Sequence, residues 1–141
     1  MKSGEWSLGY SLRSDNLLYM SDNKAKNKSK ILSIDIINLY KYLTDNKNEY
    51  IMSKQLLRSG TSIGANLAES ECASSKKDFL NKLYIALKEC NETIYWIDLL
   101  KETKYIDADT FNSINSKCEE IKRMLSASTK TIQEQLKEKE I

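Results

Sequence analysis

Residues 56–92 constrain the fold of this chain more than any other segment. They place a patch of very small residues directly before a long heptad-like pattern. Small side chains let two backbones approach closely, and a heptad repeat packs helices side by side. The segment therefore predicts a bundle of helices, and nothing in its spacing indicates a particular reaction.

The composition also favours helices. The 141-residue chain contains no proline and four glycines, and 30% of its residues are charged. Proline is a strong interrupter of helices and a frequent loop residue, so its absence from the whole chain favours long helices. A chain of this length is sufficient for one domain with a hydrophobic core.

Apolar spacing predicts four helices. Two are expected at about residues 28–44 and 49–73, a third after residue 75 and a fourth after residue 107. The loops between them are short, which places helices that follow each other in sequence antiparallel. We therefore predict an all-α fold, an antiparallel up-down-up-down four-helix bundle over residues 25–136.

Capping residues support two of these helix starts. Ser75 is expected to cap the third helix, with Asp78 three residues later in a capping box. Asp107 or Asp109 is expected to cap the fourth helix, where a carboxylate also interacts favourably with the positive end of the helix dipole.

The first helix has an apolar stripe that is expected to face the core. The stripe consists of Leu32, Ile36, Leu39 and Leu43 at a 4-3-4 spacing, and Ile34, Ile37 and Tyr40 are expected to widen it. Such a stripe is typical of an amphipathic helix that packs along one side.

The two chain ends lie outside the bundle pattern. Residues 1–24 mix Trp6, Tyr10 and Tyr19 with small and polar residues, without a sustained helical period. They are expected to form an irregular leader arm: a short hairpin, an arm that docks its aromatic rings on a neighbour, or a segment disordered in isolation. The polar residues 137–141 are expected to form a frayed tail.

The second predicted helix carries an unusual group of small and polar residues. Each of its two glycines costs about 1 kcal/mol relative to alanine in a helix interior, so we expect another helix to pack closely over this face. The alternative is a local break near Gly60. A row of four polar residues either bonds to a partner helix or lies in solvent. The row is Arg58, Ser62, Asn66 and Glu69, and the helix-packing motif also includes Gly60, Gly64 and Ala68.

The third predicted helix is apolar on more than one face. Its heptad seam consists of Leu80, Leu83, Leu87, Cys90, Ile94 and Ile97. A helix with further apolar residues off its seam is usually covered on more than one side, which predicts a homo-oligomer interface. The alternative is that these side chains cap the bundle ends. The predicted interface residues are Tyr84, Ile85, Tyr95, Trp96 and Leu99.

Catalytic and metal-binding residue types are scarce. The chain has no histidine, which removes the commonest general base and the commonest metal ligand. No glycine-rich phosphate-binding motif is present. Glu69, Glu89 and Glu92 are the best carboxylate candidates, but metal sites in bundles usually add histidine. We predict no catalytic, cofactor-binding or metal-binding residue, and a protein that is not an enzyme.

The three cysteines indicate the redox state of the cellular compartment in which the protein is expected to act. Cys72, Cys90 and Cys118 match no zinc or redox spacing, and Cys90 and Cys118 lie on apolar stripes as expected for core residues. An odd number of cysteines without a signal peptide argues for reduced thiols in the cytoplasm. No apolar run approaches the roughly 18 residues of a membrane span.

A lysine cluster near the start of the first helix is the main charge feature. Its members are Lys24, Lys26, Lys28 and Lys30, whereas the net charge of the whole chain is only +2. Such a cluster either solubilises the start of a helix or binds the phosphates of RNA.

The motifs in the second and third predicted helices resemble those of the 23S rRNA-intervening-sequence protein family. The resemblance extends from about residue 28 to residue 106 and is dense over residues 53–100. The first motif is carried by Ser62, Ile63, Asn66, Leu67, Ala68, Glu69 and Ser70. The second is carried by Phe79, Ile85, Ala86, Glu89 and Glu92. The leader is not part of the usual family pattern.

The resemblance implies a four-helix bundle that assembles as a ring, typically a homopentamer, with no established enzymatic activity. Distantly similar bundles serve as accessory subunits of diversity-generating retroelements, where they bind template RNA and a reverse transcriptase. We therefore expect a non-catalytic, homo-oligomeric scaffold or accessory protein in an RNA or ribonucleoprotein context. The alternative is an adaptor that binds another protein, such as a reverse transcriptase, through its leader or an outer groove.

Overall fold

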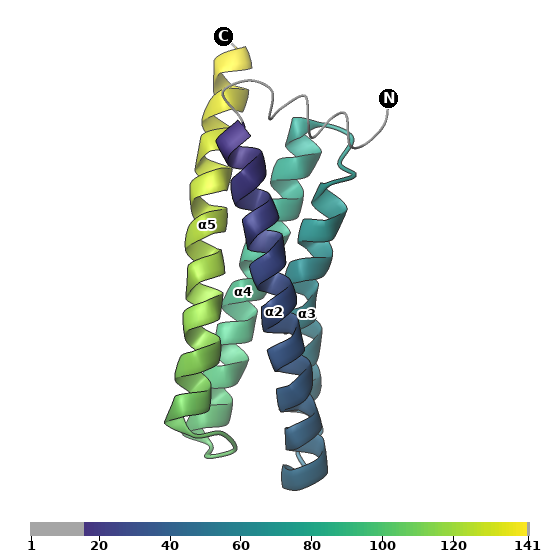
Figure 1. Ribbon diagram of the computed structural model, residues 1–141, viewed down its shortest axis with the longest axis vertical. Coiled ribbons are helices and arrows are strands. Elements are labelled where there is room, and N and C mark those ends of the chain that lie inside the picture. The colour runs from purple at the N-terminus through teal and green to yellow at the C-terminus, as the bar shows by residue number, and fades with distance from the viewer. Residues whose placement is uncertain (1–15, 141) are drawn as a thin grey trace.

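A computed structural model describes the backbone of residues 16–140 and the side chains of residues 23–139. These residues form four helices, α2 (Asn16–Lys47), α3 (Met52–Ser70), α4 (Lys76–Glu102) and α5 (Ala108–Glu140), shown in Figure 1. The prediction of an all-α four-helix bundle is confirmed. Residues 1–15, which hold most of the predicted leader, lie outside the described residues.

Both ends of the bundle are more helical than the sequence pattern indicates. Residues 16–24, predicted to be irregular, form the start of α2, and α5 remains helical through residues 137–140, where fraying was predicted. These segments lack the apolar period on which the prediction depended. Backbone hydrogen bonding can extend a helix beyond its amphipathic part, because adding one residue to an existing helix costs far less than starting a new one.

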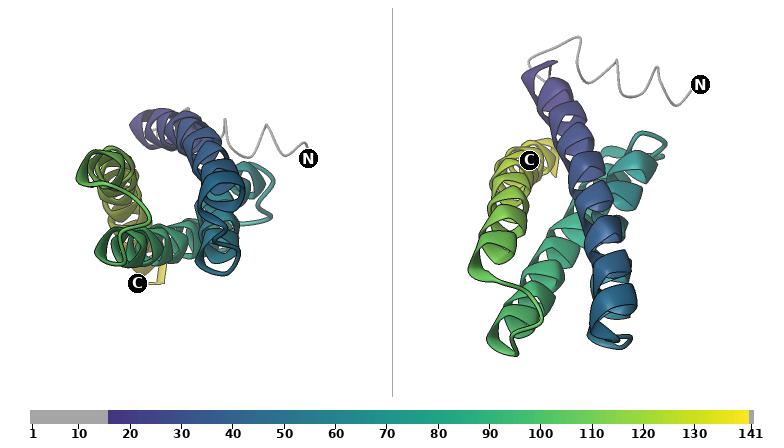
Figure 2. Two further views of the ribbon diagram at one scale, coloured as in Figure 1. Left: turned by 90° about the horizontal axis from the view of Figure 1, so that it is seen from below. Right: turned by 60° about the horizontal axis from the view of Figure 1, so that its bottom comes forward.

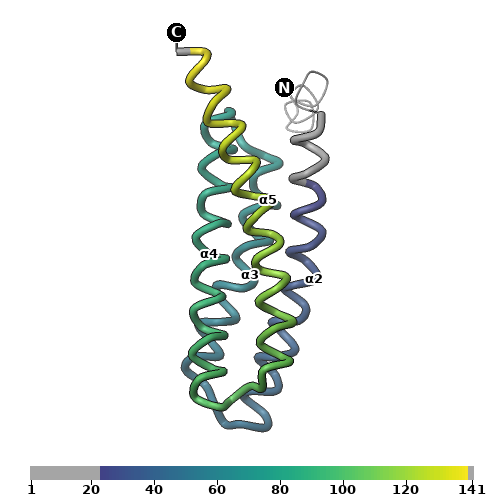
Figure 3. The backbone as a smooth tube through the Cα atoms, turned by 90° about the vertical axis from the view of Figure 1, so that its left-hand side faces the viewer, coloured from purple at the N-terminus to yellow at the C-terminus, as the bar shows by residue number. Residues whose placement is uncertain are grey.

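Each helix packs against two others in a closed arrangement. α3 packs on α2 and α4, and α5 packs on α4 and α2. The view along the bundle shows this four-sided arrangement (Figure 2), and the view from the α5 side shows α4 and α2 flanking α5 with α3 behind (Figure 3). In Figure 1 successive helices run in opposite directions, so the start of α2 lies at the same end as the end of α5.

Large aliphatic side chains from all four helices fill the space between them. The largest of the fully buried residues are Leu32, Ile36, Leu43, Leu56, Ile63, Leu67, Leu83, Ile97, Leu100, Ile121, Leu125 and Ile132. Cys90 and Cys118 are also buried, and burial raises the pKa of each thiol to about 12. They therefore stay protonated at neutral pH and pack as small core residues, as predicted.

The two glycines of α3 allow close packing against α2. A Cβ atom on Gly60 would lie 2.8 Å from Cγ1 and 2.9 Å from Cγ2 of Ile36, which is fully buried. A Cβ atom on Gly64 would lie 3.1 Å from the hydroxyl of Ser29. The helix is continuous through both positions, so the close helix contact is present and the alternative of a break near Gly60 is wrong.

Glu49 lies in the turn between α2 and α3. Its carboxylate accepts hydrogen bonds from the backbone N–H groups of Ile51, Met52 and Ser53, at 3.1, 3.1 and 2.7 Å. These are N–H groups that have no partner within the first turn of a helix. The second helix was predicted to start at about residue 49. It starts at Met52, with Ile51 at the N-cap position, and the Glu49 carboxylate bonds to the N–H groups that a side chain at Ile51 cannot satisfy.

Side-chain caps also start α4 and α5. The Asp78 N–H donates to the Ser75 hydroxyl at 3.0 Å, and the Asp78 carboxylate accepts from the Ser74 N–H at 3.1 Å. The Thr110 N–H donates to the Asp107 carboxylate at 2.8 Å, which lowers the pKa of Asp107. Ser75 and Asp107 therefore have the capping roles that their positions predicted.

Substituting each glycine by alanine tests the contact between α2 and α3. We expect Gly60→Ala to lower the free energy of unfolding, because an overpacking cost of about 1–3 kcal/mol exceeds the gain of about 1 kcal/mol in helix propensity. Gly64→Ala is the matched control. There the nearest atom, the Ser29 Oγ, lies at 3.1 Å and needs to shift by only a few tenths of an ångström, so stability should stay the same or rise. Urea denaturation measures both, and equal stability of the two variants would contradict the proposed packing limit.

The Glu49 cap predicts a pH-dependent contribution to stability. Burial raises the pKa of this carboxyl, but the backbone hydrogen bonds from Ser53, Met52 and Ile51 together bring it below its ordinary value of 4.5. A lowered folded-state pKa stabilises the fold above the unfolded-state pKa, and this contribution is lost as the pH falls through the folded-state value. At pH 7 we expect Glu49→Gln to lower the free energy of unfolding by about 1–2 kcal/mol.

The difference between wild type and Glu49→Gln should shrink in acid, once the wild-type carboxylate is protonated. Urea denaturation at neutral pH and well below the ordinary carboxyl pKa measures this change. Glu69→Gln is a suitable control, because Glu69 is exposed and bonds a lysine side chain instead of a helix start. A pH-independent difference for Glu49→Gln would show that the charge is not what stabilises the turn.

Candidate functional site

The polar row of α3 faces α4. Arg58 forms ion pairs with Glu89, at 3.4 Å, and with Glu92. Glu69 accepts a hydrogen bond from Lys82 at 3.0 Å. The two ends of the row thus bond to α4 of the same chain. Its partly exposed pairs hold the register of the two helices but contribute little free energy individually.

The middle of the row bonds to its own helix. The Ser62 hydroxyl donates to the Arg58 carbonyl at 2.6 Å, and the Asn66 amide donates to the Ser62 carbonyl at 2.8 Å. Ala68 is exposed, so its methyl group is not part of the packing between helices. The predicted helix-packing motif therefore divides into glycines against α2 and polar residues towards α4.

A buried polar contact lies beside this row. The hydroxyl groups of Ser59 and Thr93 are 3.0 Å apart between α3 and α4, and both residues are buried. Thr93 also donates to the Glu89 carbonyl at 2.8 Å. Sequence reasoning assigned no such role to Ser59 or Thr93. The available signal was the position of both residues on the core-facing side of their helices.

All three carboxylates that were candidates for a metal site have cationic partners. Glu89 and Glu92 pair with Arg58, and Glu69 pairs with Lys82. Among the residues whose side chains are described, no group of three histidine, cysteine, aspartate or glutamate residues is arranged to hold a metal ion. No helix in the same part of the chain is long and apolar enough to cross a membrane.

The structure divides the lysine cluster between two sides of α2. Lys26 pairs with Glu71, beyond the end of α3, at 2.8 Å, and Lys28 pairs with Glu120 of α5 at 2.6 Å. The Lys28 hydrogen bond and charge lower the pKa of Glu120. Lys24 and Lys30 are exposed. The four lysines therefore lie on two sides of α2, because alternate residues of a helix point in nearly opposite directions.

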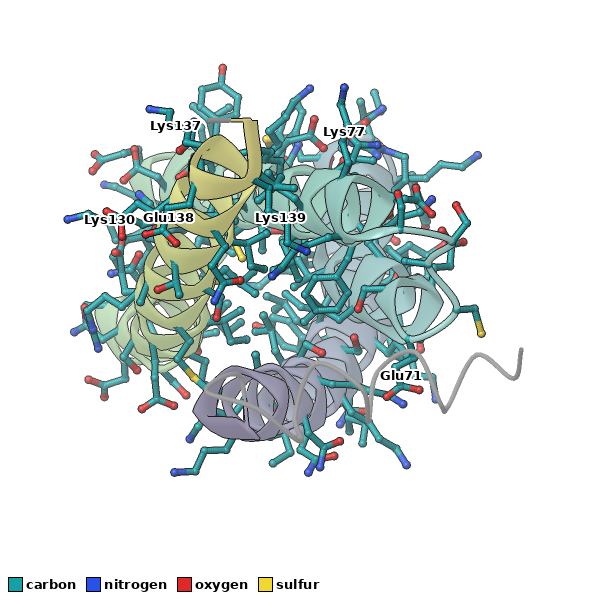
Figure 4. The ribbon with its side chains drawn as sticks, turned by 90° about the horizontal axis from the view of Figure 1, so that it is seen from above. Glu71, Lys77, Lys130, Lys137, Glu138 and Lys139 are labelled. Carbon is teal, nitrogen blue, oxygen red and sulfur yellow. The ribbon has the colours of Figure 1, made fainter. Side chains whose placement is uncertain are left out.

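The balance of charged residues differs between the two halves of the bundle. The half that holds the start of α2 comprises residues 16–32, 64–87 and 123–140, with eleven Lys and Arg against seven Asp and Glu. The other half, residues 33–63 and 88–122, has nine against eleven. Figure 4 looks onto the basic half and labels four of the lysines there, Lys77, Lys130, Lys137 and Lys139.

The predicted oligomer-interface residues differ in how far the packing of α4 leaves their side chains exposed. Tyr95 and Tyr84 are 56% and 36% exposed, and Ile85 and Leu99 are partly exposed. Trp96 instead packs against the core, and its indole ring meets the Tyr95 ring edge-on at a centroid distance of 5.1 Å. The indole N–H is buried without a hydrogen-bond partner. We refer to Tyr84, Tyr95 and the adjacent Leu99 as the tyrosine face.

A second exposed apolar surface lies on α2. Ile31, Ile34 and Ile37 are 56%, 51% and 37% exposed, and we refer to them as the isoleucine stripe. The prediction that Ile34 and Ile37 widen the core stripe is wrong. At 100° per residue, these positions point away from the side of α2 that holds Leu32 and Ile36.

A groove of about 1020 Å³ opens between α2, α5 and the loop before α5. It lies towards the end of the bundle where α2 and α3 stand apart from α4 and α5 in Figure 1. Its lining combines apolar residues and two tyrosines, Tyr42 and Tyr105, with four lysines and three aspartates. Lys117 and Asp35 pair across it. Sequence reasoning did not locate this groove, because its walls come from segments distant in sequence.

A family model described as 23S rRNA-intervening sequence protein matches residues 21–127. A similar solved structure is that of a protein of unknown function from the S23 ribosomal protein family of Bacteroides thetaiotaomicron. It is 52% identical, with a TM-score of 0.77, and the match covers 78% of this chain and 98% of the other. No curated protein matched the chain.

The matched range includes every residue of the two motifs in α3 and α4 that first indicated a resemblance. It also includes the glycine contact with α2 and the ion pairs of Arg58. The match to the family model leaves residues 1–20 and 128–141 outside. With more than half of its length matched, the chain belongs to the 23S rRNA-intervening sequence protein family.

Proposed function

We propose that this protein is a non-catalytic homo-oligomer that acts as a scaffold or accessory protein in an RNA or ribonucleoprotein context. The observation that carries this proposal is the tyrosine face of α4. Tyr84 and Tyr95 are exposed about three helical turns apart, on a helix whose opposite side fills the core. Exposed aromatic side chains that combine an apolar ring with a polar group favour protein interfaces.

The proposed partner at the tyrosine face is a second copy of the chain. The family resemblance favours a ring of five copies, and neighbours in such a ring are not related by a twofold axis. The tyrosine face therefore meets a different surface of the next copy. Trp96 packs against the monomer core and is only partly buried, so we propose that Tyr84, Tyr95, Ile85 and Leu99 make most of the contact.

Ring symmetry also gives the charge distribution a consequence. We propose that the helices run along the symmetry axis of the ring, so that all copies point the same way and all of their basic halves lie on one side of the ring. Each half carries eleven cationic against seven anionic residues, and repetition strengthens the field at that side. This surface, which includes Lys24 and Lys30, is the proposed RNA contact.

The chemistry of the side chains supports a non-catalytic role. The three carboxylates that were candidates for a metal site are held in ion pairs: Glu89 and Glu92 with Arg58, and Glu69 with Lys82. Two of the three thiols, Cys90 and Cys118, are buried and protonated. We further propose that the protein acts in the cytoplasm, where its three free cysteines stay reduced.

The groove between α2 and α5 favours a second candidate function, an adaptor that binds another protein. Its aliphatic residues, its two tyrosines and its mixed charges resemble a protein-binding surface more than a phosphate-binding one. The reverse transcriptase suggested by the resemblance is one such partner. Retention of a protein partner after nuclease treatment, with no affinity for RNA, would favour the adaptor over the RNA-associated scaffold.

Paired tyrosine substitutions test the oligomer. We expect Tyr84→Ser with Tyr95→Ser to lower the native mass, because the two rings leave the contact between copies while the monomer core is unchanged. The matched control is Tyr42→Ser with Tyr50→Ser, which removes two exposed tyrosines from elsewhere. Native mass spectrometry or light scattering measures the subunit number. An unchanged mass of the α4 variant, or a monomeric wild type, would contradict the proposed interface.

Salt dependence tests the RNA contact. We expect the wild type to bind single-stranded RNA at about 50 mM salt and to lose affinity steeply as salt rises, because binding releases counterions. Lys24→Gln with Lys30→Gln should weaken binding more than Lys41→Gln with Lys54→Gln, which removes two exposed lysines from the acidic half. Fluorescence anisotropy measures both. Absence of binding at low salt, or equal effects of the two pairs, would reject this contact.

A further inference from the structure

The isoleucine stripe is an exposed apolar surface on the outer side of α2. Ile31, Ile34 and Ile37 are 56%, 51% and 37% exposed, and they follow one another over about 9 Å of helix length. Among the described helices, α2 packs on α3 and α5 but not on α4. No described helix therefore covers the stripe, and exposed apolar surfaces of this kind mark interaction sites.

The tyrosine face lies at the opposite corner of the bundle. α2 and α4 both pack on α3 and α5 but not on each other, and they stand on either side of α5 in Figure 3. The stripe and the tyrosine face therefore point away from each other and cannot meet within one chain. Each copy can bind one neighbour through α2 and another through α4, which is the head-to-tail arrangement of a ring.

Two contacts through α3 relate positions on α2 to positions on α4. Ile36 of α2 lies against Gly60 of α3, where a Cβ atom would come within 2.8 Å of the isoleucine side chain. The residue before this glycine, Ser59, bonds to Thr93 of α4 at 3.0 Å. Ile36 and Thr93 therefore lie at nearly the same height along the bundle.

The stripe and the tyrosine face then lie level with each other. α2 and α4 run in the same direction in Figure 1, so counting equal steps from Ile36 and Thr93 places the stripe beside residues 88–94 of α4. The tyrosine face extends from Tyr84 to Leu99, and its middle lies between residues 91 and 92. The centres of the two surfaces agree to within about one helical turn, or about 5.4 Å.

Equal height is what a ring requires of two surfaces in contact. Copies related by rotation about an axis that runs along the helices are not shifted along that axis. A surface on one copy can therefore meet only a surface at the same height on the next copy. The isoleucine stripe meets this condition for the tyrosine face.

The two surfaces are also chemically complementary. Isoleucine side chains have no hydrogen-bonding group, and tyrosine rings offer apolar area with a hydroxyl group that can remain in water. Opposite charges lie at one end of the two surfaces. Lys41 is seven residues after Ile34, and Glu102 is seven residues after Tyr95. Residues seven apart share one side of a helix, and both charged residues are exposed.

Lys88 lies within the tyrosine face, four residues after Tyr84, and is exposed. A lysine in such a position can lay its aliphatic stem along an apolar surface while its ammonium group stays in water. Its charge is therefore compatible with an isoleucine neighbour across the contact.

On the basis of the proposed ring, we propose that the isoleucine stripe of one copy packs against the tyrosine face of the next copy, with Ile34 between Tyr84 and Tyr95. The stripe is then the second half of the interface to which the tyrosine face belongs. Lys41 and Glu102 pair at the edge of this contact.

Crosslinking between copies tests the pairing in the full-length protein. An Ile31→Cys variant and a Lys88→Cys variant are co-expressed with different tags, both with Cys72→Ser, because Cys72 is exposed while the other two cysteines are buried. A bismaleimide crosslinker tolerates a mismatch of about one helical turn. We expect covalent dimers that contain one copy of each variant, as seen by electrophoresis and by mass spectrometry of the linked peptides.

The matched control replaces Lys88→Cys by Ala65→Cys, which places the second thiol at an exposed position of α3 near the same height. We expect no crosslink from this pair or from either variant of the test pair alone. Dimers of the Ile31→Cys variant alone would overturn the proposal, because two stripes would then meet about a twofold axis. Absence of mixed dimers, or equal crosslinking of the control pair, would also overturn it.

Native mass separates this pairing from the proposed function. An oligomeric wild type without the crosslink rejects only the pairing, whereas a monomeric wild type rejects both. Ile31→Ser with Ile34→Ser should lower the subunit number, because the stripe leaves the contact while the core is unchanged. The control, Tyr50→Ser with Ile51→Ser, removes two exposed residues from the turn before α3 and should not change it. A native mass unchanged by the stripe variant would overturn the pairing.

Discussion

At Gly60 the backbone of α3 lies against the side chain of Ile36 in α2, at a distance that leaves no room for a Cβ atom. The rest of the bundle depends on this contact. It brings the two helices close enough for Ile36, Ile63 and Leu67 to be buried together, and one turn later Gly64 meets the small Ser29. The helix propensity lost at both glycines is offset by close packing along the α2–α3 interface.

Polar interactions then join α4 to this pair. Arg58 and Glu69 bond to α4, and the buried hydroxyl groups of Ser59 and Thr93 meet between them. Each of these hydroxyl groups also donates to a carbonyl of its own helix, at Leu56 and Glu89, so neither buried group is left without a partner. Glu49 has a similar role at the preceding turn, because its carboxylate bonds to the first N–H groups of α3.

The surface that remains after packing has separate regions with different chemistry. The tyrosine face lies on α4, the isoleucine stripe on α2, and the groove between α2 and α5. One half of the bundle is basic and the other acidic. These regions are exposed, whereas the carboxylates of Glu69, Glu89 and Glu92 are held in ion pairs with Lys82 and Arg58.

The sequence by itself determined the four helices, the caps at Ser75 and Asp107, the close contact at the glycines and the family, because these depend on spacing within one helix or on short motifs. Only the tertiary structure decided which faces of α2 are covered. Periodicity could not show that Ile34 points outwards, that Trp96 belongs to the core, or that Lys28 pairs with Glu120. The physical reason is that exposure and pairing depend on the neighbouring helices, whose contacting residues lie far away along the chain.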